Sequence, residues 1–340
     1  MTPVSTDSRF YRRLVGVCCL VCVCLLWSTD VLAQRITPSI SQYIQQTWTL
    51  EDGLPQSSVT ALHQTRDGYL WIGTQEGVAR FDGIDFHTYN AANSALALNA
   101  VTSLQETRDG SLWIGTMGGG LTRVQADSMV TYDRNDGLPG DRISALVEDA
   151  DGRLVAGTYE AGLARWMGDR FEPLLPDDLP LNIVDLALDG NGGLWVASRD
   201  QGLFHVRGSL ATRISSIPVS VALRDIEVGA NNVVWVATVE SGLYQLAYAG
   251  STTRLLAHFP PGAPMPDEGI RTLLEAPSGD LWMGSGQEGL FRFDGQRSDT
   301  YYSADGLAFD NISALLFYRE GTLWVGTDGG GLVQYLVGTF

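Results

Sequence analysis

The chain has 340 residues, 44% of them hydrophobic, and a net charge of −17 at neutral pH. This length allows one large domain or two of average size, and the apolar content suffices for a hydrophobic core. Phosphate backbones and anionic membrane surfaces attract clustered Lys and Arg, so the excess of 39 acidic over 22 basic side chains argues against nucleic acid or an anionic membrane surface as partner.

The first 33 residues are predicted to be an export signal. Arg9, Arg12 and Arg13 precede an apolar stretch at 14–27, and residues suited to a signal peptidase follow at 31–33. The stretch is short for a membrane span of about 20 residues, so we expect cleavage and a periplasmic protein. An uncleaved signal would instead tether the chain to the inner membrane.

The positions of the cysteines argue against disulfides and thiolate metal sites in the mature chain. All four, Cys18, Cys19, Cys22 and Cys24, lie inside the predicted signal. The chain from residue 34 onward is therefore expected to contain no disulfide and no thiolate metal site.

One short phrase, as in Leu-Trp-Ile-Gly-Thr at 70–74, recurs along the mature chain. Its Trp, or the residue in its place, returns at intervals of 42, 42, 40, 40, 47 and 42 residues. Repeats of this length are typical of propeller blades. The seven positions are Trp71, Trp113, Val155, Trp195, Trp235, Trp282 and Trp324.

Each unit reads as four short strands, A to D, joined by glycine turns. In the first unit they are expected at 59–64, 69–74, 78–81 and 85–89. Strand B is apolar at successive positions, so it must be covered on both faces, and sheets stacked around an axis provide that cover. The sequence therefore predicts an all-β fold, a seven-bladed β-propeller of four-stranded antiparallel blades that occupies residues 34–340.

The N-terminal strand is expected to complete the seventh blade. The last unit has strands A, B and C at 312–317, 322–327 and 332–335, but no full strand D follows. At the other end, the segment 41–49 has the spacing of an outer strand, because Trp48 lies eleven residues before Val59. Pairing of this segment with the last strand C would close the ring and cover a bare edge.

The repeating tryptophans are predicted to be core residues, since an indole buries a large apolar area. The third unit has Val155 where six others have Trp. Trp166 on strand C of the same unit is the expected filler of the space that Val155 leaves.

Three segments resemble the two-component regulator propeller repeat. They are WTLEDGLPQSSVTALHQTRDGYLWIGTQEGVARFDG, YDRNDGLPGDRISALVEDADGRLVAGTYEAGLARW and YYSADGLAFDNISALLFYREGTLWVGTDGGGLVQY. The third unit departs from the pattern at Val155, and the fifth lacks the Asp-Gly turn at 229–235. The resemblance implies a periplasmic, ligand-sensing and non-catalytic domain, and many such relatives respond to glycan fragments. It also implies a transmitter, a histidine kinase or diguanylate cyclase, which we expect to be fused in a longer product or encoded nearby.

Differences between the copies predict a ligand site at the channel mouth. The second residue of strand A is arginine in two neighbouring units, Arg224 and Arg271, and smaller in the other five. Two guanidinium groups on neighbouring blades can hold a small glycan or an anionic ligand through forked hydrogen bonds. The alternative is a structural role, with Asp225 as the partner of Arg224.

The turns between strands B and C are expected on the same face and differ between the copies. The candidate ligand-binding residues on these turns are Tyr159, Arg199, Glu240 and Gln287. The alternative for this rim is a set of ordinary solvated loops.

No catalytic residue, metal site or cofactor is predicted. The histidines fall at unrelated repeat positions, His63 on strand A, His205 on strand C, and His87 and His258 on outer strands. The acidic turns at 149–152 and 189–193 lack the downstream Glu of a calcium loop. The alternative function is a propeller lyase or glycan-cleaving enzyme, which would need His and carboxylates together on the channel face. The expected partners are a small-molecule or oligosaccharide ligand and the transmitter, and a homodimer is left open.

Overall fold

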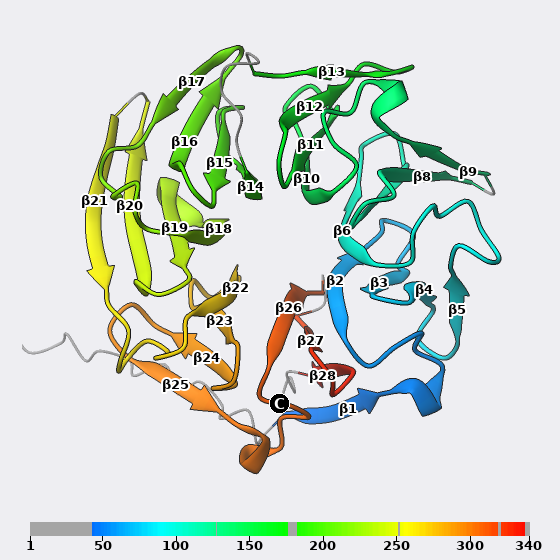
Figure 1. Ribbon diagram of the computed structural model, residues 1–340. Helices are drawn as coiled ribbons and strands as arrows, with labels where there is room; N and C mark the ends of the chain where they lie inside the picture. The colour runs from blue at the N-terminus through cyan, green and yellow to red at the C-terminus, as the bar shows by residue number, and fades with distance from the viewer. Residues whose placement is uncertain (1–42, 127, 176–181, 251, 319–320, 337–340) are drawn as a thin grey trace, which may run out of the picture. The chain divides into compact units, whose positions relative to one another are not determined.

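The computed structural model describes residues 43–126, 128–175, 182–250, 252–318 and 321–336. These residues form seven four-stranded antiparallel sheets arranged around one axis (Figure 1). The predicted export signal at residues 1–33 lies outside the described residues. In the described part of the chain, no helix is long and apolar enough to cross a membrane.

The first four blades each use four consecutive strands, ordered from the channel outward. Blade 1 contains β2 (Val59–Gln64), β3 (Leu70–Thr74), β4 (Gly77–Phe81) and β5 (Phe86–Tyr89). Blade 2 contains β6 (Val101–Glu106), β7 (Leu112–Thr116), β8 (Leu121–Gln125) and β9 (Ser128–Tyr132). Blade 3 contains β10 (Ile143–Glu148), β11 (Leu154–Thr158), β12 (Gly162–Trp166) and β13 (Phe171–Pro173). Blade 4 contains β14 (Ile183–Leu188), β15 (Leu194–Ser198), β16 (Gly202–Arg207) and β17 (Leu210–Arg213).

The last three blades complete the ring and confirm its predicted closure. Blade 5 contains β18 (Leu223–Val228), β19 (Val233–Thr238), β20 (Leu243–Ala249) and β21 (Thr252–Phe259). Blade 6 contains β22 (Ile270–Glu275), β23 (Leu281–Ser285), β24 (Leu290–Phe293) and β25 (Ser298–Tyr301). Blade 7 contains β26 (Ile312–Phe317), β27 (Leu323–Thr327), β28 (Leu332–Leu336) and, as its outer strand, β1 (Ile44–Trp48). In this blade β1 pairs antiparallel with β28, with Trp48 opposite Leu332.

The recurring strand phrase is buried because each strand B faces a neighbouring blade. All five residues of β3 and of β7 are buried. The glycine of the phrase marks a close approach between blades: a Cβ added at Gly73 would lie 2.6 Å from Cγ1 of Val101, the first residue of the next inner strand. The recurring phrase therefore has a structural role: it packs one blade against the next and is flanked by the turns of its hairpins.

The Asp-Gly-Leu part of the repeat forms the connection from one blade to the next. Short 3-10 turns occupy these connections at η2 (Leu50–Asp52), η3 (Arg134–Asp136) and η5 (Ser303–Asp305), whereas η4 (Ala230–Asn232) replaces the missing Asp-Gly turn of blade 5. Gly137 ends η3 at φ +94, and a Cβ there would meet the Phe171 carbonyl oxygen. The leucine that follows, Leu138, is buried. The motif therefore caps a turn and anchors it in the core.

The prediction that Trp166 fills the space beside Val155 is wrong. The Trp166 ring lies 5.3 Å from that of Trp113 in blade 2, on the opposite side of blade 3. Val155 packs instead in a cluster with Phe204 and Val206 of blade 4. The reason is that strand B side chains at this level face the following blade, whereas the Trp166 side chain faces the preceding one.

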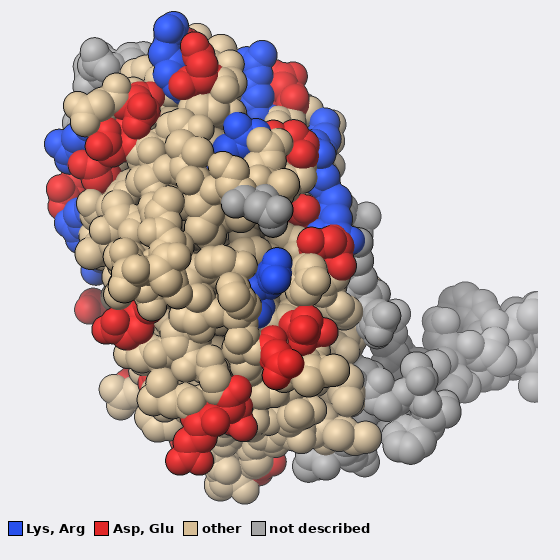
Figure 2. Space-filling view, turned by 90° about the vertical axis from the view of Figure 1, so that its right-hand side faces the viewer, with Lys and Arg blue, Asp and Glu red and all other residues tan. Residues whose placement is uncertain are grey.

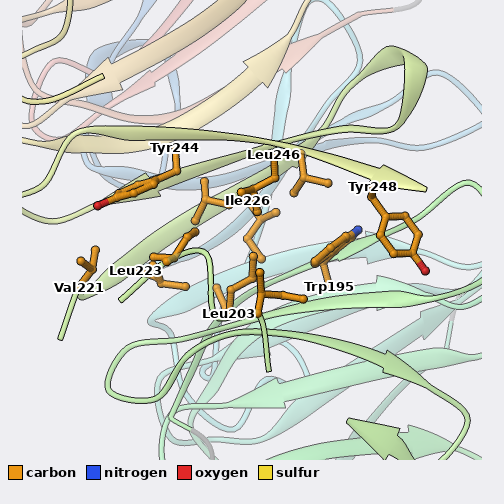
Figure 3. Packing of buried hydrophobic residues seen from close by; sticks show 13 residues of the cluster. Trp195, Leu203, Val221, Leu223, Ile226, Tyr244, Leu246 and Tyr248 are labelled. Carbon is orange, nitrogen blue, oxygen red and sulfur yellow. The ribbon is translucent and has the colours of Figure 1, made fainter. Parts of the chain in front are cut away.

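The interface between blades 4 and 5 shows how these layers pack. Trp195 of β15 and Leu203 of β16 meet Leu223 and Ile226 of β18 in one buried cluster (Figure 3). At the outer end of this cluster, the Tyr248 ring lies 5.2 Å from the Trp195 ring, edge to face. Apolar burial between sheets of this kind holds each blade to its neighbour.

The side of the ring that carries β5 and β9 has a mixed surface. Figure 2 shows acidic and basic side chains interspersed over a mostly uncharged face. No extended basic patch is seen on this face.

Candidate ligand site at the channel mouth

A bulge at the start of every inner strand turns two successive side chains into the channel. In all seven blades the register between strands A and B shifts between the first and third residues of strand A, for example between Val59 and Ala61. A β-bulge re-aims the side chains around it. The second and third residues of each inner strand therefore both line the channel pocket.

This pocket encloses about 310 Å³ and is lined from all seven blades. At the second position of the inner strand, hydroxyl groups tie one blade to the next: Thr60 donates to the Val101 carbonyl at 2.7 Å, and Thr102 to the Ile143 carbonyl at 2.8 Å. Arg224 of β18 and Arg271 of β22 hold the same position in blades 5 and 6 and line the same pocket. The two predicted arginines therefore do lie in the channel, on neighbouring blades.

Only one of the two arginines has an acidic partner among the described residues. The Nη1 atom of Arg271 lies 3.4 Å from Oδ2 of Asp328, on the turn between β27 and β28. For Arg224, no ion pair or hydrogen bond is formed within the described part of the chain. Burial lowers the pKa of the Arg224 guanidinium, and the positive charges of Arg271 and Arg199 lower it further.

The suggested pairing of Arg224 with Asp225 is wrong. The Asp225 carboxylate accepts hydrogen bonds from the backbone N–H of Ile226 at 3.0 Å and of Leu273 at 2.6 Å. Because those oxygens are directed at backbone amides, the carboxylate forms no ion pair with the guanidinium of the preceding residue.

Two of the four predicted rim residues lie near this arginine pair. Both affect the pKa of the Arg224 guanidinium: the positive charge of Arg199 lowers it, and Tyr159, in its phenolate form, raises it. The Arg142 guanidinium lies 5.3 Å from the centre of the Tyr159 ring. Glu240 and Gln287 are exposed on their own turns, and among the described residues nothing joins them to the arginines by a hydrogen bond or ion pair.

Sequence reasoning missed an acidic pair in the same pocket. Asp185 and Asp225 are the third residues of β14 and β18, and both line the channel. Burial raises the pKa of each carboxyl group, and the negative charge of Asp225 raises that of Asp185 further. A signal was available, since the third position of strand A is acidic in two neighbouring units just as the second is basic in two.

A third buried acid lies further along the same strand. Burial raises the pKa of Glu227 to about 7, and the charges of Asp225 and Glu275 add to the effect. Its Oε1 atom accepts the backbone N–H of Glu275 at 3.0 Å, across the interface between blades 5 and 6. Glu227 therefore lies between two blades, whereas the carboxyl groups of Asp185 and Asp225 line the channel pocket with the two arginines.

The histidines lie on the strands where the sequence predicted them. His63 is on β2, His87 on β5, His205 on β16 and His258 on β21. In the structure's described residues, no group of three or more His, Cys, Asp or Glu side chains is placed to hold a metal ion.

A family model for the two-component regulator propeller matches the chain at residues 53–76, 95–118 and 137–160. Each match runs from a blade connection through strands A and B of blades 1, 2 and 3. Histidine kinase P4 of Formosa agariphila is 40% identical over 58 residues, which are 17% of this chain and 4% of that protein. The chain thus aligns with only a small part of that curated relative.

Solved structures share the fold over most of the chain. The extracellular domain of a B. thetaiotaomicron protein assigned as a hybrid two-component system is similar with a TM-score of 0.72 and 20% identity. The match covers 86% of this chain and 42% of that one. Virginiamycin B lyase from Staphylococcus aureus, solved with quinupristin, is similar with a TM-score of 0.69 and 14% identity, over 87% of this chain and 100% of the lyase. The chain thus carries two-component regulator propeller repeats in blades 1 to 3 of a seven-bladed propeller, which confirms the resemblance seen in the sequence.

Proposed function

We propose that this chain is a non-catalytic, periplasmic ligand-sensing propeller of a signal-transduction system, of the two-component or the cyclic-di-GMP type. The observation that carries the proposal is the guanidinium of Arg224, which lines the channel pocket without an ion-pair partner among the described residues. A half-buried charge without a partner is costly. A bound anion or a cluster of ligand hydroxyl groups would supply the missing acceptors.

The ligand that fits this pocket is a small glycan or another anionic molecule. Arg224 and Arg271 present guanidinium donors from neighbouring blades, a geometry suited to carboxylate or hydroxyl oxygens. Tyr159 offers a ring on which a sugar can stack, and Arg199 adds a further positive charge at the rim. Glu240 and Gln287 stay candidates for specificity at the more distant part of the rim.

The output of the signal would come from a partner. A histidine kinase or diguanylate cyclase, fused in a longer product or encoded nearby, is the transmitter that we infer. The match to a histidine kinase and the fold shared with the extracellular domain of a hybrid system support this part of the proposal. A homodimer would be a second route for the signal, which light scattering with and without ligand would detect.

The channel proposal is tested by thermal shift with a panel of neutral and uronic-acid oligosaccharides. A ligand that binds only the folded state raises the melting temperature, and we expect an acidic glycan to do so by several degrees. Arg224→Ala should lose this shift. Arg254→Ala, on the exposed outer strand β21, is the matched control and should keep it. A shift that survives Arg224→Ala would place the site elsewhere.

A propeller lyase or glycan-cleaving enzyme is the second candidate, favoured by the fold shared with virginiamycin B lyase. Such a site would need a general base beside the channel carboxylates. The inner-strand histidine, His63, is held by the next blade: its Nε2 accepts the Glu106 N–H at 3.2 Å, and burial lowers its pKa to about 4. Turnover of a glycan or lactone panel by the purified protein would replace the sensing proposal with the enzymatic one.

A further inference from the structure

The interface between blades 1 and 2 lacks a ring that the other tryptophan interfaces have. At five of the six repeat tryptophans, an aromatic ring of the following blade lies 5.2–6.3 Å from the indole, centre to centre. These pairs are Trp113 with Trp166, Trp195 with Tyr248, Trp235 with Phe293, Trp282 with Phe317 and Trp324 with Phe81. Within the described residues, the ring partner of Trp71 is Tyr89 of its own blade, at 5.6 Å.

The missing ring has a local cause in blade 2. Phe81 and Phe293 occupy the strand C position opposite the first residue of strand B, Leu70 and Leu281. At the same position in blade 2, Val124 lies opposite Leu112. A valine is too small to reach across to the indole of Trp71 as a phenyl ring does.

A cavity lies where the ring is missing. It encloses about 550 Å³ and is lined by Trp71, Tyr89, Leu112, Val124 and Met129 on its apolar side. Arg80 and Asn93 are among its polar lining residues. None of the residues that line this cavity lines the channel pocket, so the two are separate.

The arginine in this cavity also departs from its counterparts. Arg123 and Arg165, which occupy the same position in blades 2 and 3, form ion pairs at 2.7 and 2.8 Å with the aspartates of their A–B turns. Arg80 lies instead over the ring of Tyr69, 4.5 Å from its centre, and within the described residues it forms no ion pair or hydrogen bond. Blade 2 has the small Ser111 in place of Tyr69, so Tyr69 holds Arg80 away from its turn.

The two acids in the lining already have donors. Asp67 Oδ1 accepts the Thr65 hydroxyl at 2.5 Å, and Glu106 Oε2 accepts the backbone N–H of Arg66 at 3.0 Å. Both carboxylates can only accept, so the guanidinium of Arg80 is the cationic donor among the residues that line the cavity.

We propose that this cavity is a second binding site, for a small molecule that combines an aromatic ring with a carboxylate. The ring would take the place that an aromatic side chain fills at the other interfaces, packed against Trp71 and Val124. The carboxylate would accept the forked donors of the Arg80 guanidinium. The proposal goes beyond the channel site and does not depend on it.

Titration calorimetry of the purified protein with phenylacetate tests this site. We expect saturable binding, at least about tenfold weaker binding of phenylacetamide, which lacks the charge, and no detectable binding of acetate, which lacks the ring. Val124→Phe should place a side-chain ring where the ring of the ligand would lie and abolish binding. Arg80→Gln should weaken binding about tenfold with little change in melting temperature, because Arg80 has no ion pair to lose.

Arg123→Gln is the matched control, since it removes the ion-paired counterpart of Arg80 in the next blade. It should lower the melting temperature and leave phenylacetate binding intact. Absence of saturable binding to the wild type overturns the proposal. So does equal binding by Arg80→Gln, or equal affinity for phenylacetamide. If Val124→Phe does not fold, the Arg80 variant and the two control compounds decide the matter.

Discussion

Asp185 and Asp225, on neighbouring blades, accept hydrogen bonds from the same backbone amide: the N–H of Ile226 lies 2.9 Å from Oδ2 of Asp185 and 3.0 Å from Oδ1 of Asp225. Two carboxyl groups so close together cannot both carry a charge without strong repulsion. Burial raises the pKa of both groups, and their mutual hydrogen bond raises that of Asp185 and lowers that of Asp225. The two carboxyl groups are therefore expected to share one proton.

The buried Glu227 is expected to make the protein less stable as the pH rises from about 4.5 to about 7. Burial raises the pKa of Glu227 from 4.5 to about 7, so the folded state binds more protons than the unfolded state in this window. The contribution of Glu227 is fully present below pH 4.5 and is lost as the pH rises through about 7. At about 1.4 kcal/mol per pKa unit, the loss is at most about 3.5 kcal/mol.

Glu227→Gln tests this pH dependence by urea unfolding at pH 4.5 and pH 7.5. The variant keeps a carbonyl oxygen for the Glu275 N–H but carries no charge. We expect it to be about 1–3 kcal/mol more stable than the wild type at pH 7.5, and closer to it at pH 4.5. Glu240→Gln, at an exposed turn position, should have the same stability as the wild type at both pH values. Equal pH profiles for Glu227→Gln and the wild type would contradict the assignment.

Removal of β1 is expected to destabilise the ring severely. The β1 strand covers the edge of β28, and the Trp48 ring lies 5.3 Å from Trp324 and 5.2 Å from Phe81. Deletion of residues 34–49 together with the signal should lower the melting temperature far more than deletion of residues 1–33 alone, and should cause aggregation through the bare edge. Equal melting temperatures for the two deletions would show that β1 contributes nothing to closure.

Trp166→Ala is expected to lower the free energy of unfolding by about 3–5 kcal/mol, because it removes a large core side chain. The Trp166 ring is 8% exposed and contacts the rings of Trp113, Tyr132 and Phe171. The loss should exceed that of Phe293→Ala. Trp166→Phe, which keeps a ring in this cluster, should recover much of it. A loss near zero in chemical denaturation would mean that Trp166 is not a core residue.

Arg224→Ala and Arg271→Ala should have different effects on the melting temperature of the unliganded protein but the same effect on its stabilisation by ligand. Without ligand, Arg224→Ala should leave the melting temperature unchanged or slightly raised, because it removes an unpaired, half-buried charge. Arg271→Ala should lower it by no more than a few degrees, because the pair with Asp328 is partly exposed. Both variants should lose ligand-induced stabilisation. Unfolding of either variant would identify that arginine as scaffold.

The sequence by itself determined the blade number, the strand order and the closure of the ring. Each depends on local information: turn residues at regular intervals, apolar runs in strand B, and an N-terminal strand with the spacing of the outer strand that the last unit lacks. The position of Arg224 and Arg271 in the channel could also be predicted from the sequence, because the second residue of strand A has the same place in every blade. Regular repetition converts sequence position directly into spatial position.

Only the tertiary structure decided which side chains meet. Asp225 is the chain neighbour of Arg224, yet its carboxylate bonds Leu273 of the next blade and lies beside Asp185 of the preceding one. Trp166 and Val155 belong to paired strands of one blade, yet they pack against opposite neighbours. Each sheet has two buried faces, and each inner strand carries a bulge. Alternation along a strand divides its side chains between the two faces, but the residues that each face meets are set by the stacking of the neighbouring blades.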